Sequence, residues 1–405
     1  MGSVKDLITE GIGGNLYIPP EPRKFGRGAW KVSGRFSVAD LKGLIPSEFE
    51  IKEKNFVLAM TAGAYFEDAA EHGIDSCYLG MMNKDGNIVA VKDLLDVGEL
   101  SDVIVMKLAN TPKSGSNADV EAYHQAIRKR EITVYVADVE SIFRAGLPLG
   151  SSVFKKICGM MGKADMYEQA ATYDQTVSLL DEIRGELTGM AMPEDVAKYI
   201  STLGLECIPN PGKMLPKPVF NYTTKFAETG DTDINEAEVI LRLGGDETAY
   251  SSWRDRLARC SDHQINYARQ RGFSNMDGKV ENVGLKLTDF ACTVDENRLM
   301  LLYEKDGVHY LVPSNKEIQR AIFRKNGIYT AIEEAKKTDK ENWKDHIFEF
   351  TTRAALIEAA EVSVGMMGDA IGTIGNLALG KTIFTAKPID QWVGPFLPYA
   401  SRVQK

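Results

Sequence analysis

Three separated segments of the chain contain residue types that could bind and transfer phosphate. The first is ESIFRAGLPLGSSVFKK at 140–156, where Arg144 is followed by glycines, a proline and Ser151. A guanidinium can make bidentate contacts with a phosphate, and a Gly-rich turn adds backbone N–H groups and a hydroxyl. This pattern is typical of a phosphate-binding turn, although an ordinary surface turn could contain the same residues.

The second segment is LPKPVFNYTTKFAETGDTDINEAE at 215–238. Its prolines stiffen the entrance, Thr224 and Lys225 offer donors, and Asp231 and Asp233 offer carboxylate oxygens. The donors could meet a phosphate or a carboxylate. The two acids could hold a metal ion, but taken alone they are better explained as acids at the start of a following helix.

The third segment is LKLTDFACTVDENRLMLLYE at 285–304, which predicts two strands around an Asp-Glu-Asn turn. Lys286 and Asp289 fall on the first strand, and Glu304 ends the second. Mg²⁺ takes oxygen ligands, usually one or two carboxylates together with phosphates. Acids at adjacent strand ends would suit a Mg²⁺–nucleotide site, and a solvated hairpin is an equally good explanation.

The composition limits the kind of partner. The chain has 405 residues, with 57 Asp and Glu against 48 Lys and Arg and a net charge of −9. That charge repels a phosphate backbone, which argues against nucleic acid or an anionic membrane as a partner. The 44% of apolar residues exclude a disordered chain, and the length predicts two or three coupled lobes. An anionic small molecule would therefore need a local cationic pocket.

The cysteines and the N-terminus indicate the compartment. The five cysteines are an odd number, widely spread, with no CxxC pair and no zinc-type grouping with histidine. Lys5, Asp6 and Glu10 interrupt the first apolar stretch, which therefore does not match a secretory signal. We expect reduced thiols and a cytoplasmic protein.

Apolar periodicity predicts the elements that would position these segments. Strands are predicted at 56–65, 87–91, 103–108 and 133–143. Helices are predicted at 117–130, across 163–203 and at 236–271. The Pro-rich loop at 208–220 is the clearest boundary in the middle of the chain.

The tail at 354–380 is almost free of charge. Its glycines are spaced three, four and three residues apart, which on a helix forms one face of small residues: Gly365, Gly368, Gly372 and Gly375. A membrane span would put Asp369 near its centre at a cost of about 2–3 kcal/mol. We therefore expect a helix that is buried or lies at a subunit interface of a homo-oligomer, and no membrane partner.

Together these segments resemble the phosphoribosylaminoimidazole-succinocarboxamide synthase (SAICAR synthetase) family of purine synthesis. Residues 215–235 resemble the family's LPEP-IF-TP-TTKAE-GDHDEN signature, and residues 140–156 resemble its VECVVR-GYLAGS-WK element. Upstream, VIVMKLAN at 103–110 is similar to the LVRKLE strand, and residues 33–74 are similar to the stretch from SDRISAFD to GI. The resemblance covers roughly residues 15–335.

The resemblance implies an α+β, two-lobed fold. An N-terminal ATP-side lobe with an antiparallel-rich sheet would span 1–110, and a larger mixed α/β lobe for substrate and Mg²⁺-ATP would span 111–340. Residues 341–405 would form an extra C-terminal helical region.

The resemblance also implies which residues bind the substrates. Arg144 and Ser151 would hold the 5′-phosphate of a ribotide. Ser37 and Asp40, in the turn that matches SAFD, would lie beside the amino-acid substrate. The neighbourhood of the ribotide and Mg²⁺ would contain Thr224, Lys225, Asp231 and Asp233.

On the nucleotide side, the resemblance implies that Lys107 lies near ATP. Lys286, Asp289 and Glu304 would match the family's KFEFG strand and the acidic strand after it, with Asp289 and Glu304 as ligands of Mg²⁺. Lys225, Lys286 and Asp289 would then form the catalytic set.

The chain departs from the family at three places. LYIPPEPRK replaces the LYEGKAK hairpin over the ATP phosphates, so that Lys24 is the cation left to reach ATP. Residues 232–235 replace HDEN, and PSNKEI at 313–318 replaces PDSSRFW, with Lys316 in place of an arginine. Lysine is a point charge and lacks the bidentate fork of arginine.

The implied reaction joins the carboxylate of an aminoimidazole ribotide to L-aspartate through an acyl phosphate, at the expense of ATP. Two alternatives remain open. The chain could join another acid or amine by the same chemistry, or it could be a noncatalytic relative with a ligand-binding or assembly role.

Overall fold

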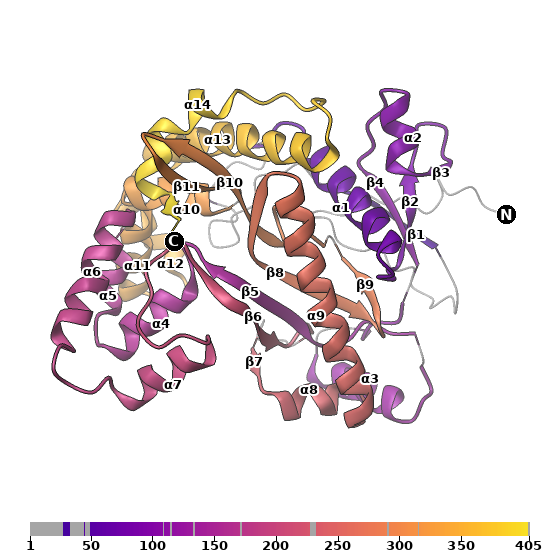
Figure 1. Cartoon of the computed structure of the whole chain (residues 1–405), viewed down its shortest axis with the longest axis horizontal. Coiled ribbons are helices and arrows are strands. Elements are labelled where there is room, and N and C mark those ends of the chain that lie inside the picture. The colour runs from indigo at the N-terminus through magenta and orange to yellow at the C-terminus, as the bar shows by residue number, and fades with distance from the viewer. Residues whose placement is uncertain are drawn as a thin grey trace.

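Two antiparallel sheets organise the chain in the computed structural model, which describes residues 27–32, 44, 49–107, 109–113, 116–132, 134–170, 172–226, 232–289, 291–314 and 316–403. The first sheet has four strands, in the order β1 (Arg27–Lys31), β4 (Val103–Lys107), β2 (Tyr78–Met82) and β3 (Ile88–Val89). Helix α1 (Lys54–Glu71) and the short α2 (Val91–Asp96) belong to the same lobe (Figure 1).

The second sheet has eight strands. Seven follow the order β12 (Ser401–Arg402), β11 (Val308–Pro313), β10 (Asn297–Lys305), β8 (Phe273–Val283), β5 (Glu140–Leu147), β6 (Lys213–Thr223) and β7 (Asp233–Ile234). The eighth, β9 (Lys286–Thr288), pairs with the end of β8. Every pair in both sheets is antiparallel.

Helix α9 (Glu247–Gln270) covers one face of the second sheet and crosses β8, β5 and β6 (Figure 1). Its Gln264 accepts a hydrogen bond from Asn297, which faces Gly278 on β8. Phe143 of β5 also faces Gly278 and is fully buried. Because side chains alternate along a strand, the residues on either side of these positions point away from α9.

The remaining helices pack at the ends and edges of the sheets. They are α3 (Asn117–Arg128), α4 (Ser152–Met160), α5 (Ala164–Gln169), α6 (Tyr173–Glu186), α7 (Glu194–Thr202), α8 (Glu236–Arg242), α10 (Lys316–Lys325), α11 (Ile328–Thr338), α12 (Trp343–His346), α13 (Arg353–Leu379) and α14 (Ile389–Trp392), with 3-10 turns η3 (Ile347–Glu349) and η4 (Gly394–Tyr399). A separate apolar cluster joins α4, α5, α6 and α7. The observed α+β architecture, with antiparallel sheets and a helical C-terminal region, confirms the expected fold class. Lobe boundaries at 110 and 340 stay a prediction.

Three predicted elements were wrong. Residues 56–65 lie in α1 and form no strand, because Ala, Leu and Met in that run suit a buried helix as well as a strand. The predicted helix 236–271 is two helices, since Gly244 and Gly245 have φ of 100° and 78°. The strand predicted at 133–143 begins at Glu140, preceded by isolated bridges at Tyr135 and Val136.

The hairpin predicted at 285–304 was also wrong. Gly284 has φ of 58°, and the chain turns there so that Lys286 faces Val283 on β8. Strand β10 pairs instead with β8 and β11. Two apolar runs around a polar turn do not reveal which neighbouring strand each run joins.

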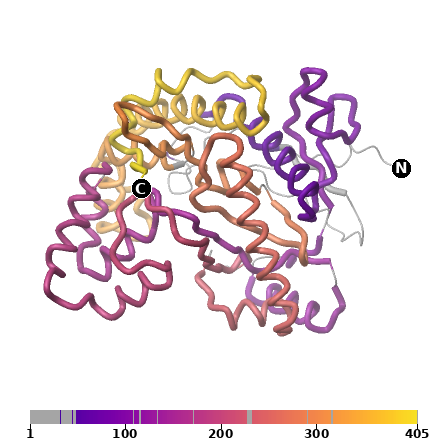
Figure 2. The backbone as a smooth tube through the Cα atoms, viewed as in Figure 1, coloured from indigo at the N-terminus to yellow at the C-terminus, as the bar shows by residue number. Residues whose placement is uncertain are grey.

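Helix α13 is long and apolar enough to cross a membrane, yet 44% of its most apolar window is buried inside the protein. It packs against α1 and α10. Thr352 caps its start, and Gly380 ends it with φ of 64°. The end of the chain then adds β12 to the second sheet, where Figure 2 shows it beside the segment after β5.

Only part of the predicted glycine face of α13 is closely covered. A Cβ added at Gly375 would lie 2.6 Å from the Phe384 ring and 3.0 Å from Val57, and one at Gly372 would lie 2.9 Å from the Thr385 oxygen. No described atom lies within 4 Å of a Cβ added at Gly365. The close approach therefore occurs within the chain.

We expect Gly375→Ala to lower the free energy of unfolding by about 1–3 kcal/mol, because the added methyl group overpacks the contact with Phe384. Gly365→Ala, on the open side of the same helix, should be neutral or stabilise by up to about 1 kcal/mol through helix propensity. Urea denaturation of both variants measures the difference, and equal changes in stability would contradict it.

Candidate active site

The face of the second sheet that points away from α9 is polar. On β5, Arg144 faces Asp277 of β8, and Ile142 faces Lys279. Glu140 and Glu281 belong to the same alternating series, so charged residues of the two central strands share one face.

Lys279 is the centre of this face. Its Nζ lies 3.0 Å from Glu140 Oε1, 2.9 Å from Glu281 Oε1, 2.9 Å from Glu296 Oε2 and 3.7 Å from Asp289 Oδ2. Lys225 makes a second ion pair with Glu281, whose side chain is 3% exposed. We call these six residues the Lys279 cluster; with all of them ionised, four carboxylates face two ammonium groups.

The excess of acid shifts the pKa values of the carboxyl groups. Burial, together with Glu281 and Glu296, raises the pKa of Asp289 to about 8. Burial likewise raises the pKa of Glu140 to about 7, although Lys279 opposes the rise. Burial would also raise the pKa of Glu281, but Lys225 and Lys279 outweigh it and hold this pKa at about 2. The cluster thus favours additional positive charge, and its oxygen donors fit Mg²⁺.

Asp289 has an unusual backbone conformation, with φ of 63°. This left-handed region is uncommon for residues other than glycine, though Asp and Asn enter it more readily than most. It turns the chain immediately after β9, at the point where Asp289 joins the Lys279 cluster.

The first and second candidate phosphate-binding segments, 140–156 and 215–238, contact each other at Arg144. Its Nε donates to Asn221 Oδ1 over 3.3 Å, and its terminal nitrogen donates to Ser152 Oγ over 3.2 Å. Asp277 lies 3.7 Å away, and the Arg144 side chain is 13% exposed. Tyr199 feels the charges of both Arg144 and Asp233, although burial is the main reason that its pKa is raised.

Arg298 connects this neighbourhood to the turn after β5. It pairs with Asp277 at 2.6 Å and with Glu317 at 3.2 Å, and it donates to the Gly150 oxygen over 3.2 Å. A Cβ added at Gly150 would collide with the Glu317 carboxylate. The turn consequently requires glycine at this position.

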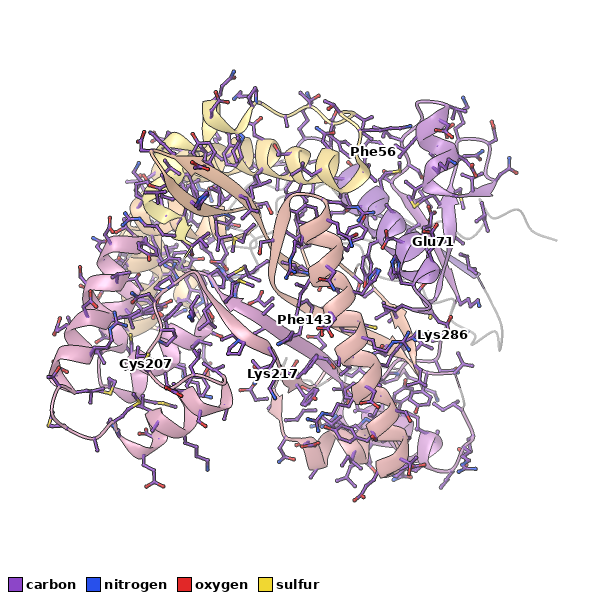
Figure 3. The ribbon with its side chains drawn as sticks, in the orientation of Figure 1. Phe56, Glu71, Phe143, Cys207, Lys217 and Lys286 are labelled. Carbon is purple, nitrogen blue, oxygen red and sulfur yellow. The ribbon has the colours of Figure 1, made fainter. Side chains whose placement is uncertain are left out.

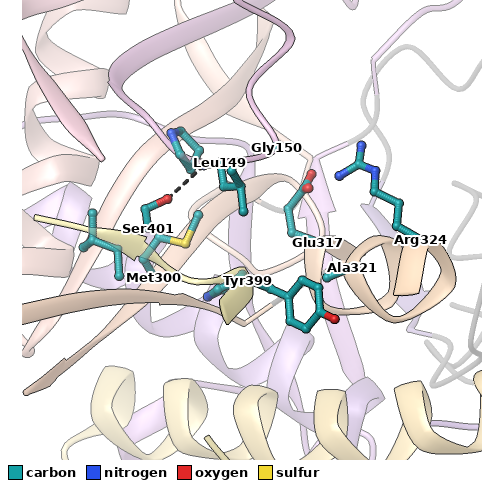
Figure 4. Close-up of a pocket in the computed structure, with 11 residues that line it drawn as sticks. Leu149, Gly150, Met300, Glu317, Ala321, Arg324, Tyr399 and Ser401 are labelled. Atoms are coloured by element: carbon teal, nitrogen blue, oxygen red, sulfur yellow. Dashed lines mark hydrogen bonds between the residues drawn. The ribbon is translucent and has the colours of Figure 1, made fainter. Parts of the chain in front are cut away.

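A small pocket lies beside the same turn (Figure 4). Leu149, Met300, Glu317, Arg324 and Tyr399 contribute to its lining, and the Leu149 N–H donates to Ser401 Oγ over 2.9 Å. Ser401 of strand β12, near the end of the chain, therefore holds the turn at Leu149 through this hydrogen bond.

Two of the predicted donors are used inside the protein. Ser151 is fully buried and caps α4, where its hydroxyl accepts from the Val153 N–H. Thr224 is 4% exposed, and its hydroxyl and main chain bond to Thr232, which closes the loop between them. In both segments these contacts shape the backbone.

Lys107 and Lys286 meet where the two lobes join. The Lys107 N–H donates to the Cys77 oxygen, and the Cys77 N–H donates to the Leu287 oxygen, over 2.8 and 2.7 Å. Burial raises the pKa of Cys77 to about 11, and Lys286 and Lys107 are the positive charges that oppose this rise. The two side chains themselves are exposed, as Figure 3 shows for Lys286 beside β9.

Asp138 positions the Thr224-Lys225 segment. Its Oδ1 accepts from the N–H groups of Lys225 and Phe226 over 3.1 and 2.9 Å, and its Oδ2 pairs with Arg242 and lies 3.0 Å from His124 Nε2. The carboxylate has no exposed surface. Burial would raise the pKa of Asp138, but these partners outweigh it and lower the pKa.

We expect Asp138→Asn to lower the free energy of unfolding by about 1–2 kcal/mol at neutral pH, because the amide loses the charge that meets Arg242. The folded-state pKa is depressed, so this contribution is present above the unfolded pKa of about 4 and is lost as the pH falls below it. Glu238→Gln, which removes the half-exposed partner of Arg242, should cost at most about 1 kcal/mol. Urea denaturation at pH 7 compares the two, and a larger loss for Glu238→Gln would contradict this role.

Comparison with known proteins relates this site to a family. No protein-family model matches the chain. A protein of Archaeoglobus fulgidus, named provisionally as a phosphoribosylaminoimidazole-succinocarboxamide synthase, is 26% identical over 354 residues, which span 86% of each chain. The expected resemblance to the SAICAR synthetase family, as a divergent relative, is thereby confirmed. The synthase of that name from Thermoplasma acidophilum is 30% identical over 165 residues, which are 39% of this chain and 52% of that protein.

Solved SAICAR synthetase structures are also similar to the chain. One in complex with ADP has a TM-score of 0.43 and 13% identity, with coverage of 85% of this chain and 96% of the other. The Saccharomyces cerevisiae SAICAR synthase complexed with SAICAR has a TM-score of 0.44 and 15% identity, with coverage of 89% and 94%.

One residue that was predicted to bind Mg²⁺, Glu304, lies far from the Lys279 cluster. Glu304 is 62% exposed and sits 3.6 Å from His309 at the β10–β11 turn. Leu301 of β10 lies opposite Phe273 of β8, and the two strands are antiparallel. Glu304 is three residues from this pair in one direction, and Lys279 is six residues from it in the other direction. At roughly 3.3 Å per residue, Glu304 is about 30 Å from the Lys279 cluster. The predicted pairing of Glu304 with Asp289 is therefore corrected; it followed from the wrong hairpin.

Of the remaining predicted site residues, the structure describes only Asp233. Asp233 is exposed on β7, where it pairs with Thr223. Four lie outside the described residues: Lys24, Ser37, Asp40 and Asp231.

Sequence reasoning on this SAICAR synthetase relative missed much of the polar face. The omitted residues are Asp138, Glu140, Asp277, Lys279, Glu281, Glu296 and Arg298. Charges at every second position of Asp277-Gly-Lys279-Val-Glu281 were the available signal, because a strand with that alternation has one polar face.

Proposed function

We propose that the protein is an ATP-dependent ligase that joins the carboxylate of a carboxylated aminoimidazole ribotide to the amine of L-aspartate. The observation that carries the proposal is the similarity to the Archaeoglobus protein over 86% of the chain. The polar face supports it, because Arg144 offers a phosphate contact near one end and acidic groups with raised pKa values lie near the other.

A carboxylate is a poor electrophile, so the chemistry needs activation. In the proposed route a ribotide carboxylate oxygen attacks the γ-phosphorus of ATP, and ADP leaves. The neutral aspartate amine then attacks the acyl carbon, inorganic phosphate leaves, and the amine gives up a proton. No covalent protein nucleophile is required, and positioning and electrostatics supply the rate enhancement.

The residues would share this work along the sheet face. Arg144 would bind the 5′-phosphate of the ribotide, while Lys225 would offset charge on the carboxylate and the transferred phosphoryl group. Asp289 would hold Mg²⁺ together with other acids of the Lys279 cluster, and Lys107 and Lys286 would approach ATP from the junction of the lobes. Mg²⁺, when bound, would offset negative charge on the phosphates.

The candidates outside the described residues keep their proposed roles. Lys24 would approach ATP, Ser37 and Asp40 would lie beside aspartate, and Asp231 would join the loop that Thr224 and Asp233 border. A cytoplasmic location and a homo-oligomer, with small-molecule partners only, complete the proposal.

The decisive experiment measures ADP release from Mg²⁺-ATP by the full chain. ADP and an amide product of the expected mass should form only when the ribotide and L-aspartate are present together. Release with a different acid or amine would identify the alternative ligase. If neither turnover nor a thermal shift by Mg²⁺-ATP is seen, the noncatalytic alternative replaces the proposal.

A further inference from the structure

A second group of metal-binding residue types lies away from the polar sheet face, between α1 and α9. Asp68 lies in the last turn of α1, His72 is the C-cap residue of that helix, and His263 comes from α9. His263 Nε2 lies 3.0 Å from Asp68 Oδ1, and His72 Nδ1 lies 3.6 Å from the same oxygen. One ligand atom from each residue can be chosen so that all three lie within 4.8 Å of one another.

This spacing suits a first-row transition metal. Zn²⁺ binds imidazole nitrogen and carboxylate oxygen at about 2.0–2.2 Å, so ligand atoms around a tetrahedral ion are separated by roughly 3.3–3.5 Å. The two measured separations bracket that value. Two imidazoles and a single carboxylate oxygen also favour Zn²⁺, Ni²⁺ or Cu²⁺ over Mg²⁺, which prefers oxygen ligands.

His263 is a largely buried imidazole that directs its Nε2 at the Asp68 carboxylate. Its side chain is 10% exposed, and its Nδ1, on the other side of the ring, is buried without a hydrogen-bond partner in the described structure, so Nε2 is the nitrogen that faces the candidate site.

Surrounding residues hold the carboxylate and leave a path from solvent. Arg271 pairs with Asp68 Oδ2 at 3.0 Å and stacks on Tyr267, so Oδ1 remains directed at the two imidazoles. Asp68 and Arg271 also line an open groove with Glu67 and Glu71. His72 is 58% exposed, so it can turn toward an incoming ion without repacking the core, and in doing so its Nδ1 exchanges the 2.8 Å contact with the Asp68 main-chain oxygen for the metal.

We propose that Asp68, His72 and His263 form a binding site for a transition-metal dication of the Zn²⁺ type, which fastens α1 to α9. The site is separate from the Lys279 cluster and from the Mg²⁺ of the proposed reaction. It links the helix of the first lobe to the helix that covers the second sheet. Bound metal therefore stabilises the contact between lobes by an amount that grows with the logarithm of the metal concentration above its Kd.

The test uses untagged full-length protein freed of metal with a chelator. Co²⁺ titration followed by visible absorption, and Zn²⁺ titration by calorimetry, should each show one equivalent bound and a raised melting temperature. His72→Gln and His263→Gln should each weaken binding at least tenfold. His309→Gln, a control at an exposed histidine beside Glu304, should bind as the parent does.

His72→Gln is the critical variant, because its exposed side chain can be changed without disturbing the core. Absence of saturable Co²⁺ and Zn²⁺ binding would overturn the proposal, and so would binding that survives both His72→Gln and His263→Gln. Displacement of Zn²⁺ by an equal concentration of Mg²⁺ would also overturn it, since that result indicates a nonspecific acidic surface.

Discussion

Replacing Lys279 by methionine is expected to lower the free energy of unfolding by roughly 3–5 kcal/mol at pH 8, because it leaves four acids around a position that is only 22% exposed without their central cation. Methionine keeps much of the length of the side chain, so lost packing contributes little. Lys305→Met, at an exposed position on β10, is the matched control and should change stability by less than about 0.5 kcal/mol.

The loss should depend on pH. In the parent protein the pKa values of Glu140 and Asp289 are about 7 and 8, above their unfolded values of about 4. The native state therefore binds more protons in this window, and stability from these groups is present below pH 4 and is lost as the pH rises toward 8. Without the positive charge of Lys279 the protonated forms of both groups are favoured further. The free energy of unfolding of the variant should therefore increase on acidification.

Urea denaturation of the parent and both variants at pH 5.5 and pH 8 measures these differences. Added Mg²⁺ should restore stability to Lys279→Met more at pH 8 than at pH 5.5, because ionised carboxylates are the ligands. An equal loss at the two pH values would show that Lys279 contributes by packing and not by charge.

The second large effect concerns Arg144. We expect Arg144→Ala to weaken binding of the phosphorylated ribotide by at least about 30-fold, equivalent to about 2 kcal/mol, because a shielded phosphate loses a charge-assisted contact. Arg144→Lys should recover only part of the affinity, since lysine lacks the planar fork. Lys217→Ala, an exposed cation on neighbouring β6, should have little effect.

Comparison with the dephosphorylated riboside makes this test specific. Calorimetric titration should show that Arg144→Ala affects binding of the ribotide but leaves binding of the riboside nearly unchanged. An equal loss for both ligands would mean that the substitution disturbs the ion pairs that Asp277 makes with Arg144 and Arg298, and would remove Arg144 from the phosphate site.

Sequence patterns identified some neighbourhoods well and some poorly. The turn around Arg144 and the stretch around Lys225 were both recognised, and β5 and β6 bring the two segments side by side. The Glu304 prediction failed because β9 pairs with β8, and the long helix prediction failed because two glycines end α8 before α9 begins. Local residue pattern cannot report strand partners, which depend on contacts distant in the chain.

The sequence by itself determined the acidic composition, the order of the motifs and the resemblance to the SAICAR synthetase family, because these depend on residue identity and spacing. Only the tertiary structure decided that Lys279 gathers four carboxylates and that Asp138 fixes the main chain at Lys225. Those groups are charged, and their pKa values and pairing energies depend on burial and on distances of a few ångströms. Both quantities arise only when separate strands are brought together.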